Sequence, residues 1–436
     1  MDDFLAARLQ MALSLGFHII FACIGMVMPF FMAVSHYLWI KTENQVYQNL
    51  TKAWSKGVAI FFATGAVSGT MLSFELGLLW PTFMKHAGPI FGIPFSLEGT
   101  AFFIEAIALG FFLYGWKIFN KWFHWFTGVV VGISGLASGI LVVSANAWMN
   151  APTGFDYVDG QYINIDPMLA MFNDAWFSQS IHMTLAAFAA TGFAVAGVHA
   201  AMLYQHKNVE FHLKAFKIAA FFASVASLLQ PISGDHSAKD IAIRQPAKLA
   251  AMEAHFHTQK NAPLIIGGVP NERTQEVKYA IELPGMLSFL AHGDTESEVK
   301  GLDMIPLENH PPVSIVHYAF QVMVGIGAML MSLSVFFFAG LSRQKLFFKK
   351  WFLSLYVLAV PLGFMAVEAG WTVTEVGRQP WIIYGIMRTA DAVTPMPGIA
   401  WTFYLFTAVY ISLCLVVVFL LHRQIKMVPV IYHKTV

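Results

Sequence analysis

Charged residues and cysteine are both scarce in this 436-residue sequence. Only 12% of its residues are charged, whereas a soluble protein of this size carries about 25%. The two cysteines, Cys23 and Cys414, lie in apolar runs, so the sequence indicates neither a disulfide framework nor a cysteine-based metal site. With a net charge of +1, the composition also gives no reason to expect nucleic acid as a partner.

Permanent positive charges are missing from the long apolar runs as well. All 26 lysine and arginine residues lie outside these runs, although several histidine and glutamate residues lie inside them. Together with a hydrophobic content of 57%, this distribution is typical of a protein that spans a lipid bilayer. Ionisable side chains at membrane depth are costly, so those that remain indicate function.

Nine apolar runs are long enough, at about 20 residues each, to cross the bilayer as helices. They cover residues 13–40, 57–79, 95–116, 123–147, 176–203, 218–233, 313–340, 351–370 and 401–421, and the sixth is the shortest. The first run is too long for the core of a signal peptide and is expected to remain as the first helix. The sequence therefore predicts an all-α integral membrane protein with a single membrane domain over residues 1–436.

Lysines and arginines in the short connections predict the orientation of this bundle. One alternate set of connections is rich in these cations: Lys41, Lys52, Lys56, Lys117, Lys121, Lys207, Lys214, Lys217, Arg343, Lys345, Lys349, Lys350, Arg423, Lys426 and Lys434. The other set carries only Arg8, Lys85, Arg378 and Arg388. Because cytoplasmic loops carry the excess of Lys and Arg, the N-terminus is expected outside and the C-terminus in the cytoplasm.

The long connection over residues 234–312 is expected on the outer side, between the sixth and seventh helices. It is polar, with glycine, proline and charge throughout, and a loop of this length is uncommon unless it is functional or disordered. The stretch from Pro246 to Thr258 has an amphipathic pattern, which predicts partial helix within the loop.

Five potential metal ligands from five segments are expected in the outer half of the membrane. They are His18, Glu98, His182, Met323 and Glu375. Histidine and methionine are axial ligands of heme, and a His/Met pair gives a six-coordinate heme suited to electron transfer. A carboxylate suits a high-spin iron that leaves one coordination position open. The alternatives are that each histidine is a hydrogen-bond partner between helices and that the methionine is core packing.

Glu98 and Glu105 lie seven residues apart, so they share one helix face at a separation of about 10 Å along the axis. A proton relay or a ligand role is expected for this pair, with structural hydrogen bonding as the alternative. For Glu75, which is also intramembrane, the sequence does not separate a relay from a structural role.

Three further ionisable residues lie close to helix ends. His36 and His199 are expected to snorkel to the cytoplasmic interface, and Glu368 is expected to be solvated at the outer end of its helix. None of the three is therefore predicted to belong to a functional site.

The segment over residues 371–381 combines features of a helix end with an ion pair. Gly377 and Pro380 are typical of a helix end and a turn, and its two tryptophans fit an interfacial aromatic belt. These features do not account for Glu375 and Arg378, three residues apart at the membrane edge. An arginine at this position would neutralise a heme propionate or hold the glutamate.

The run Gly377-Arg-Gln-Pro-Trp381 resembles the signature of subunit I of cytochrome bd-type quinol oxidases. Further matching segments are Phe17-His18, Leu97-Glu98-Gly99, Phe102-Phe-Ile-Glu105, Ser144-Ala-Asn-Ala-Trp-Met149, Lys248-Leu-Ala-Ala-Met-Glu253 and Met323-Val-Gly. The resemblance covers essentially the whole chain. The nine-helix, N-outside topology of that family agrees with the orientation predicted from the cations.

The resemblance implies a set of hemes and their ligands. His182 and Met323 would ligate a low-spin heme b, His18 and Glu98 would belong to one high-spin site, and Glu375 would ligate the other. One high-spin heme would be a heme b, and the other would be heme d or a third heme b. Family members differ in which of the two sites reduces oxygen, so the resemblance does not assign them.

The resemblance also implies a reaction. Quinol would be oxidised at the outer face beside the long loop, where Lys248 and Glu253 match quinol-oxidation residues. Oxygen would be reduced to water with protons from the cytoplasm, for which Glu105 matches a relay residue. Arg378 and Trp371 match residues that line the high-spin sites. Proton release outside and uptake from inside would make the reaction electrogenic without a pump.

Members of this family work with a second large membrane subunit, subunit II, and often with a small single-helix subunit, in the bacterial or archaeal cytoplasmic membrane. Two features depart from the family pattern, because Gln321 stands where many members carry arginine and the long loop is the shorter form. Two alternatives remain open. One is a related b-type cytochrome that passes quinol electrons to an acceptor other than oxygen, and the other is a proton-coupled transporter that uses Glu98 and Glu105.

Overall fold

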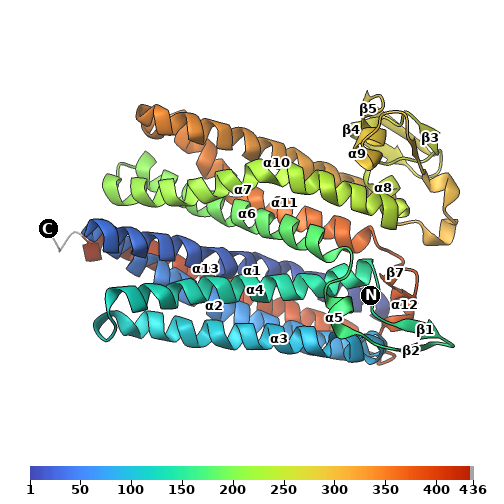
Figure 1. The fold of residues 1–436 in the computed structure, drawn as a ribbon, viewed down its shortest axis with the longest axis horizontal. Helices are drawn as coiled ribbons and strands as arrows, with labels where there is room; N and C mark the ends of the chain where they lie inside the picture. The colour runs from blue at the N-terminus through green and yellow to red at the C-terminus, as the bar shows by residue number, and fades with distance from the viewer. Residues whose placement is uncertain (433–436) are drawn as a thin grey trace.

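The computed structural model describes residues 1–432 and the side chains of residues 1–425, and it confirms the predicted helical membrane fold. Within that part of the chain, nine helices are long and apolar enough to cross a membrane, and Figure 1 shows them side by side in one bundle. They are α1 (Asp3–Thr42), α2 (Gln45–Leu79), α3 (Pro81–Tyr114), α4 (Lys121–Asn150), α6 (Trp176–Tyr204), α7 (Val209–Arg244), α10 (Val313–Ser342), α11 (Lys350–Val376) and α13 (Ile399–Tyr432). Among the cations that predict the orientation, Lys434 and the side chain of Lys426 lie outside the described residues.

Side-chain caps and a proline set where several of these helices begin. The side chains of Asp2, Asn44 and Asn120 each accept a hydrogen bond of 2.9 Å from a backbone N–H in the first turn of α1, α2 and α4. These N–H groups have no partner inside the helix, so a capping oxygen stabilises the helix start. Pro81 begins α3, where its missing N–H costs nothing.

The sixth membrane helix, α7, is much longer than the sequence predicts. It runs over 36 residues, Val209–Arg244, whereas the apolar run predicts a helix over residues 218–233 only. Its two polar ends extend beyond the apolar run and are supported by ion pairs one helical turn apart. These pairs are Lys214–Glu210, Lys239–Asp235 and Arg244–Asp240. The first residues of the predicted loop therefore belong to a helix.

The rest of the long loop folds into a small layer of its own. The predicted partial helix is present as α8 (Pro246–Met252), which confirms that expectation. The loop also contains α9 (Met286–His292), a hairpin of β4 (Leu264–Asn271) and β5 (Glu276–Leu283), and the short pair β3 (Gln259–Lys260) and β6 (Glu298–Val299). The strands were not predicted.

Other connections hold the remaining short elements. Between α4 and α6 lie β1 (Asp156–Val158), β2 (Gln161–Ile163) and α5 (Pro167–Met171), and between α11 and α13 lie β7 (Trp381–Ile383), β8 (Met387–Arg388) and α12 (Thr389–Ala392). Short 3-10 helices cover Gly115–Lys117, Leu302–Met304, Leu307–Asn309 and Gln344–Phe348.

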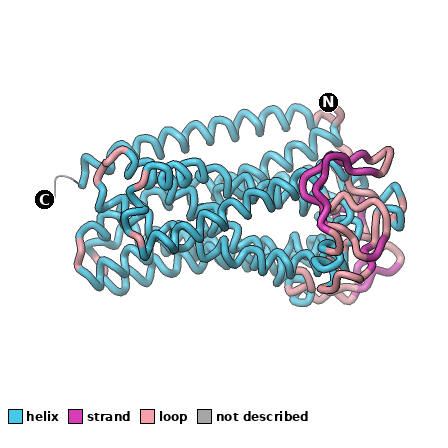
Figure 2. Tube along the Cα trace, turned by 90° about the horizontal axis from the view of Figure 1, so that it is seen from above, coloured by secondary structure: helices cyan, strands magenta, loops and turns pink. Residues whose placement is uncertain are grey.

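The strands and the long loop gather at the end of the bundle where the N-terminus lies, as Figures 1 and 2 show. The C-terminal end of α13 lies at the opposite end of the bundle (Figure 1). The long loop and the N-terminus therefore share one side of the membrane, which agrees with the relative arrangement predicted from the sequence. The assignment of that side to the exterior rests on the cations of the short connections.

Small residues let α6 approach its two neighbours closely. A Cβ atom at Gly192 of α6 would lie 2.7 Å from Cβ of Ala223 on α7. A Cβ atom at Gly363 of α11 would lie 2.9 Å from Cβ of Ala190 on α6. Such contacts need small residues at the crossing point, as is common between membrane helices. They place α6 firmly between α7 and α11.

Candidate heme and quinol sites

His18 on α1 is held in one tautomer by Ser68 on α2. The Ser68 hydroxyl donates to the carbonyl oxygen of Thr64 at 3.0 Å, so its oxygen accepts from His18 Nδ1, which lies 2.9 Å away. His18 therefore carries its ring proton on Nδ1 and keeps the electron pair of Nε2 free, as a metal-ligating histidine requires. Gly69 leaves room for the ring, because a Cβ atom there would lie 3.0 Å from His18 Cε1.

His182 on α6 has the same arrangement with Ser233 on α7. The Ser233 hydroxyl donates to the carbonyl oxygen of Gln230 at 2.9 Å and accepts from His182 Nδ1 at 2.9 Å. Gln230 Nε2 donates to His182 Nε2 at 3.1 Å, which is consistent with a free electron pair on that nitrogen. Two histidines on different helices thus present Nε2 as the atom available for a metal.

Met323 on α10 lies against α11 at a glycine. A Cβ atom at Gly370 would lie 2.9 Å from Met323 Sδ, so only a glycine leaves room for the thioether in this place. His182 and Met323 come from α6 and α10, and both helices contact α7. The two residues predicted to ligate the low-spin heme therefore lie on α6 and α10, which both contact α7.

The two carboxylates of α3 are anchored on one face of α4. Ser138 Oγ donates to Glu98 Oε1 at 2.8 Å. Glu105 is only 7% exposed, and a Cβ atom at Gly135 would lie 3.3 Å from both of its carboxylate oxygens. Gly135 and Ser138 are three residues apart, which is about 4.5 Å along the helix axis. The residues of α4 that the two carboxylate groups contact are thus about 4.5 Å apart along that helix, whereas Glu98 and Glu105 are about 10 Å apart along α3.

Glu375, at the end of α11, has one partner for each carboxylate oxygen. Arg378 Nη2 donates to Oε2 at 2.5 Å, and Asn146 Nδ2 of α4 donates to Oε1. The arginine therefore holds the glutamate, which is one of the two roles expected for it. Arg378 is 2% exposed, and its Nε and Nη1 have no hydrogen-bond partner among the described residues. These two groups suit a further anion such as a propionate, because buried donors are normally satisfied.

Lys248 and Glu253, the two residues expected at the quinol site, are both buried but occupy different surroundings. Lys248 Nζ donates to Asn150 Oδ1 at 2.6 Å, and no hydrogen bond or ion pair among the described residues joins it to Glu253. Burial lowers the pKa of Lys248 well below its usual value; the nearby Arg378 also lowers this pKa, and Glu375 opposes the shift.

Glu253 is 0% exposed, and neither of its carboxylate oxygens has a hydrogen-bond partner of normal geometry within the described part of the chain. Burial raises the pKa of Glu253 to about 8, although the backbone N–H of Ile265 acts against this shift. The carboxyl group is therefore protonated at neutral pH and titrates close to it, which is the range in which a side chain exchanges protons efficiently.

Gln321 and His317 of α10 hold the loop onto the bundle. Gln321 Nε2 donates to the carbonyl oxygen of Ile265 at 2.8 Å, and Gln321 Oε1 accepts from the backbone N–H of Gly267 at 3.0 Å. The ring nitrogens of His317 lie 2.9 Å from the carbonyl oxygen of Met252 and 3.0 Å from that of Gly267. The amide at position 321 therefore pairs with strand β4.

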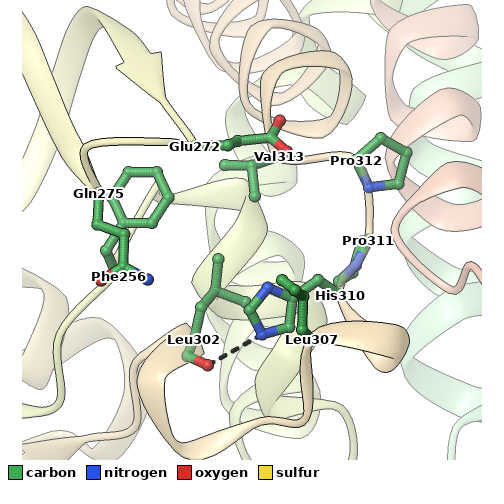
Figure 3. A pocket seen from close by; sticks show the side chains of 9 residues that line it. All are labelled: Phe256, Glu272, Gln275, Leu302, Leu307, His310, Pro311, Pro312 and Val313. Atoms are coloured by element: carbon green, nitrogen blue, oxygen red, sulfur yellow. Dashed lines mark hydrogen bonds between the residues drawn. The ribbon is translucent and has the colours of Figure 1, made fainter.

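A cavity of about 300 Å³ lies between the loop and the start of α10. Phe256, Glu272, Gln275, Leu302, Leu307, His310, Pro311, Pro312 and Val313 line it, and Figure 3 shows the His310 ring hydrogen-bonded to the carbonyl oxygen of Leu302. Phe256 follows Glu253 by three residues, whereas Glu253 and Lys248 do not line the cavity themselves.

Residues 6–429 match the family described as cytochrome bd terminal oxidase subunit I. The chain belongs to this family. A solved structure of bd oxidase from Geobacillus thermodenitrificans is similar, with a TM-score of 0.93, 39% sequence identity and 98% of each chain covered. Cytochrome bd ubiquinol oxidase subunit 1 of Bacillus subtilis (strain 168) is 30% identical over 98% of this chain and 94% of the relative.

A second Bacillus subtilis relative, provisionally named as a cytochrome bd menaquinol oxidase subunit I, is 34% identical over 99% of this chain and 98% of its own length. The family membership makes this chain a subunit of a quinol-oxidising terminal oxidase in a multi-pass membrane fold. Hemes, a quinol substrate and a second subunit belong with such a subunit I. The two relatives are named for different quinols, so their names leave the quinol of this chain open.

Two histidines of this subunit I correct the sequence analysis, because neither snorkels to the interface. His36 is 0% exposed, and its ring contacts those of Trp39 and Trp116 at centroid distances of 5.3 and 5.5 Å. His199 is 8% exposed and its Nδ1 lies 2.8 Å from Nδ1 of His212. Aromatic rings and a second histidine cover these helix ends, so the polar atoms stay inside the protein.

Glu368 is only partly exposed and is therefore not fully solvated either. Its Oε1 is buried without a hydrogen-bond partner among the described residues, and a Cβ atom at Gly16 of α1 would lie 3.1 Å from its Oε2. The carboxylate therefore lies between α11 and α1. One turn further along α11, Trp371 is partly buried in the helix core, and its indole N–H also lacks a partner in the described part of the chain.

Several residues of the candidate sites escaped the sequence analysis. They are the hydrogen-bond partners of the predicted ligands and of Lys248: Ser68, Ser138, Asn146, Asn150, Gln230 and Ser233. For Asn146 and Asn150 a signal was present, because two asparagines four residues apart in an apolar helix share one face. Single serines near a helix glycine carry no comparable pattern.

Proposed function

We propose that this subunit I holds three hemes, oxidises quinol beside the long loop at the outer face, and reduces oxygen to water with protons from the cytoplasm. The observation that carries the proposal is the shared arrangement at His18 and His182. In both, a serine hydroxyl that donates to a backbone carbonyl oxygen accepts from Nδ1, which leaves Nε2 unprotonated. Nε2 of His182 also accepts a hydrogen bond from Gln230. Hemes bound there would supply the electron transfer and the oxygen chemistry.

The ligands are divided among three places in this proposal. His182 and Met323 hold the low-spin heme b. His18 with Glu98 serves one high-spin heme, and Glu375 serves the other. One of these is a heme b, and the other is heme d or a third heme b. Near Glu375, the free Nε and Nη1 of Arg378 and the free indole N–H of Trp371 are donors for anionic groups.

The proton route in this proposal runs through Glu105. Its carboxyl group is buried on α4 at Gly135, one turn from the Ser138 hydroxyl that holds Glu98. Buried carboxyl groups in a membrane helix commonly pass protons. If the loop lies outside, as the cations indicate, Glu105 is the deeper of the two on α3 and receives protons from the cytoplasmic side.

The quinol site in this proposal lies next to α8. Glu253 accepts a proton from quinol, for which a pKa of about 8 is well placed. The cavity beside Phe256 is large enough for a substituted ring and gives such a molecule a place to approach. A second large membrane subunit and a small single-helix subunit complete the enzyme, and the complex lies in the bacterial cytoplasmic membrane.

A reduced-minus-oxidised visible spectrum of the purified complex tests the proposal. We expect bands of low-spin and high-spin b-type heme. A chlorin band would establish heme d, whereas b-type bands alone would assign the third position to heme b. The absence of any heme band would overturn the proposal and favour the transporter alternative. The names of the relatives describe quinol oxidases, so they favour neither that alternative nor an acceptor other than oxygen.

Replacing Glu253 with glutamine is expected to slow quinol oxidation by about a hundredfold, within the range that a positioned base contributes. The wild-type rate should rise with pH through about 8, because the raised pKa leaves the carboxyl protonated, and unable to accept a proton, at lower pH. That pH dependence should vanish in Glu253→Gln. The measurement is quinol:oxygen turnover between pH 6 and 9, beside oxygen uptake with an artificial donor that bypasses the quinol site.

Glu282→Gln is the matched control, because Glu282 is an exposed carboxylate on β5 of the same loop. It should keep wild-type turnover and the wild-type pH profile. Equal losses in the two assays for Glu253→Gln would count against a role in quinol oxidation.

A further inference from the structure

We propose that Lys248 is a positioning residue for Glu375, acting through Asn150 and Asn146 of α4. The long loop is thereby coupled to the Glu375 site. This inference deepens the proposed function and rests on it. It assigns Lys248 to a different task from Glu253, although both lie in the same loop segment and both resemble quinol-oxidation residues of the family.

A continuous chain of hydrogen bonds connects the two residues. Lys248 Nζ donates to Asn150 Oδ1 at 2.6 Å, and Asn150 Nδ2 donates to Asn146 Oδ1 at 3.1 Å. Asn146 Nδ2 in turn donates to Glu375 Oε1. The three bonds link the loop helix α8, the end of α4 and the end of α11, and every member except Glu375 is less than 9% exposed.

The donor and acceptor at the two ends of this series of hydrogen bonds determine how both asparagine amides are oriented. In its ammonium form Lys248 has only donors, and a carboxylate has only acceptors, so both ends of this series of hydrogen bonds are fixed. Each asparagine must then turn its oxygen toward Lys248 and its nitrogen toward Glu375. If the amide of Asn150 rotated by half a turn, two oxygens would face each other at Asn146. Lys248 thus sets the orientation of both amides and, through them, one of the two partners of Glu375.

The stem of Lys248 is also fitted against α11. A Cβ atom at Gly377 would lie 2.9 Å from Cγ of Lys248, so the lysine needs a glycine at this position between Glu375 and Arg378. Gln245, at the start of α8, adds a second link, since its Nε2 donates to the carbonyl oxygen of Asn150 at 2.7 Å. Helix α8 is therefore seated on the ends of α4 and α11, and not only on the loop.

The same short helix carries both tasks at different places. Glu253 caps the C-terminal end of α8, whereas Lys248 faces α4 from its first turn. A displacement of α8 when quinol binds would act on Asn150 and hence on Glu375. Residues that orient a metal ligand typically change metal affinity or activity by about 10- to 100-fold when they are removed, so we expect an effect of this size at the Glu375 site.

The test compares Lys248→Met, Lys248→Gln, Glu253→Gln and Lys239→Met in the purified complex. Glu375→Ala first identifies which high-spin component of the visible spectrum depends on Glu375. Lys248→Met should shift the midpoint potential of that component and speed its loss on dilution by about tenfold. Lys248→Gln keeps an N–H donor without the charge, and should restore at least part of the wild-type behaviour.

Glu253→Gln should leave the Glu375-dependent component unchanged, and so should Lys239→Met, which removes a partly exposed lysine paired with Asp235 on α7. Asn150→Leu should reproduce Lys248→Met, and the double variant should be no worse than either, because both break one chain. A Lys248→Met complex with an unchanged spectrum and potential but a raised KM for quinol would overturn the inference. Absence of heme from the wild-type complex would instead overturn the proposed function itself.

Discussion

Replacing Met323 with leucine is expected to remove the low-spin heme signal and to lower quinol:oxygen turnover by at least about tenfold, the lower limit for weakening a metal site. Leucine keeps nearly the same volume but has no atom that can ligate iron, and His182 would be the remaining ligand in the proposed site. The heme should therefore become five-coordinate and high-spin. A reduced-minus-oxidised spectrum and a redox titration of the purified complex measure the change.

Met329→Leu is the matched control for this variant. Met329 lies on the same helix α10, less than two turns further on, and is 59% exposed. Its replacement should change neither the spectrum nor the turnover. An unchanged low-spin signal in Met323→Leu would exclude Met323 as a ligand, whereas loss of all hemes in both variants would mean that α10 tolerates no substitution.

Replacing Glu105 with glutamine is expected to lower the rate of oxygen reduction by about a hundredfold while heme content stays near normal. Glutamine fills the same space against Gly135 but cannot carry a proton, and general acid–base groups typically contribute 10²- to 10⁴-fold to a rate. The measurement is steady-state oxygen uptake beside the heme spectrum of the same sample. Turnover at the wild-type level in this variant would remove Glu105 from the proton route.

Glu75 provides a demanding control for Glu105. It is a second buried glutamate, 1% exposed on α2, and its Oε1 accepts a hydrogen bond of 3.0 Å from Gln10. Its hydrogen-bond partner is on α1, whereas Glu98 and Glu105 contact α4. Glu75→Gln should therefore cost much less turnover than Glu105→Gln. Equal losses would indicate that any buried carboxylate in the bundle matters for stability, and not for proton transfer in particular.

The helical fold was predictable because a bilayer leaves few choices. A backbone in lipid must satisfy its own hydrogen bonds, so each apolar run of sufficient length becomes a helix. The ends of α7 were not predictable in this way. Apolarity ends near residue 233, but the helix continues because ion pairs such as Lys239–Asp235 replace lipid contact as the source of support. Hydropathy registers only the part of a helix that lies in the membrane.

The candidate ligands were predictable by residue type, and their partners were not. His18 stands out as a histidine in an apolar run, whereas Ser68, which orients it, lies 50 residues away and has nothing unusual in its own surroundings. The case of His36 is the reverse. Its position near a helix end indicated exposure, yet the side chain is buried against the rings of Trp39 and Trp116, and only the folded chain brings the second tryptophan there.

The long loop contains one element that the sequence predicts and one that it does not. Its first helix, α8, has a periodic pattern that a sequence shows directly, but the hairpin of β4 and β5 depends on partners outside itself. Strand β4 is held by Gln321 of α10, more than 50 residues further along the chain. The amide of Gln321, where the family resemblance implies an arginine in many members, therefore has a structural role that position 321 alone does not reveal.

One face of α4 carries Gly135, Ser138, Asn146 and Asn150, at spacings that keep them aligned along the helix. These residues contact Glu105, Glu98, Glu375 and Lys248 in turn. An axial slip of α4 by a single residue, about 1.5 Å, would misplace all four contacts at once. The axial position of α4 therefore sets the placement of the proposed proton-relay residue, of two residues proposed for the high-spin sites and of the long loop at the same time.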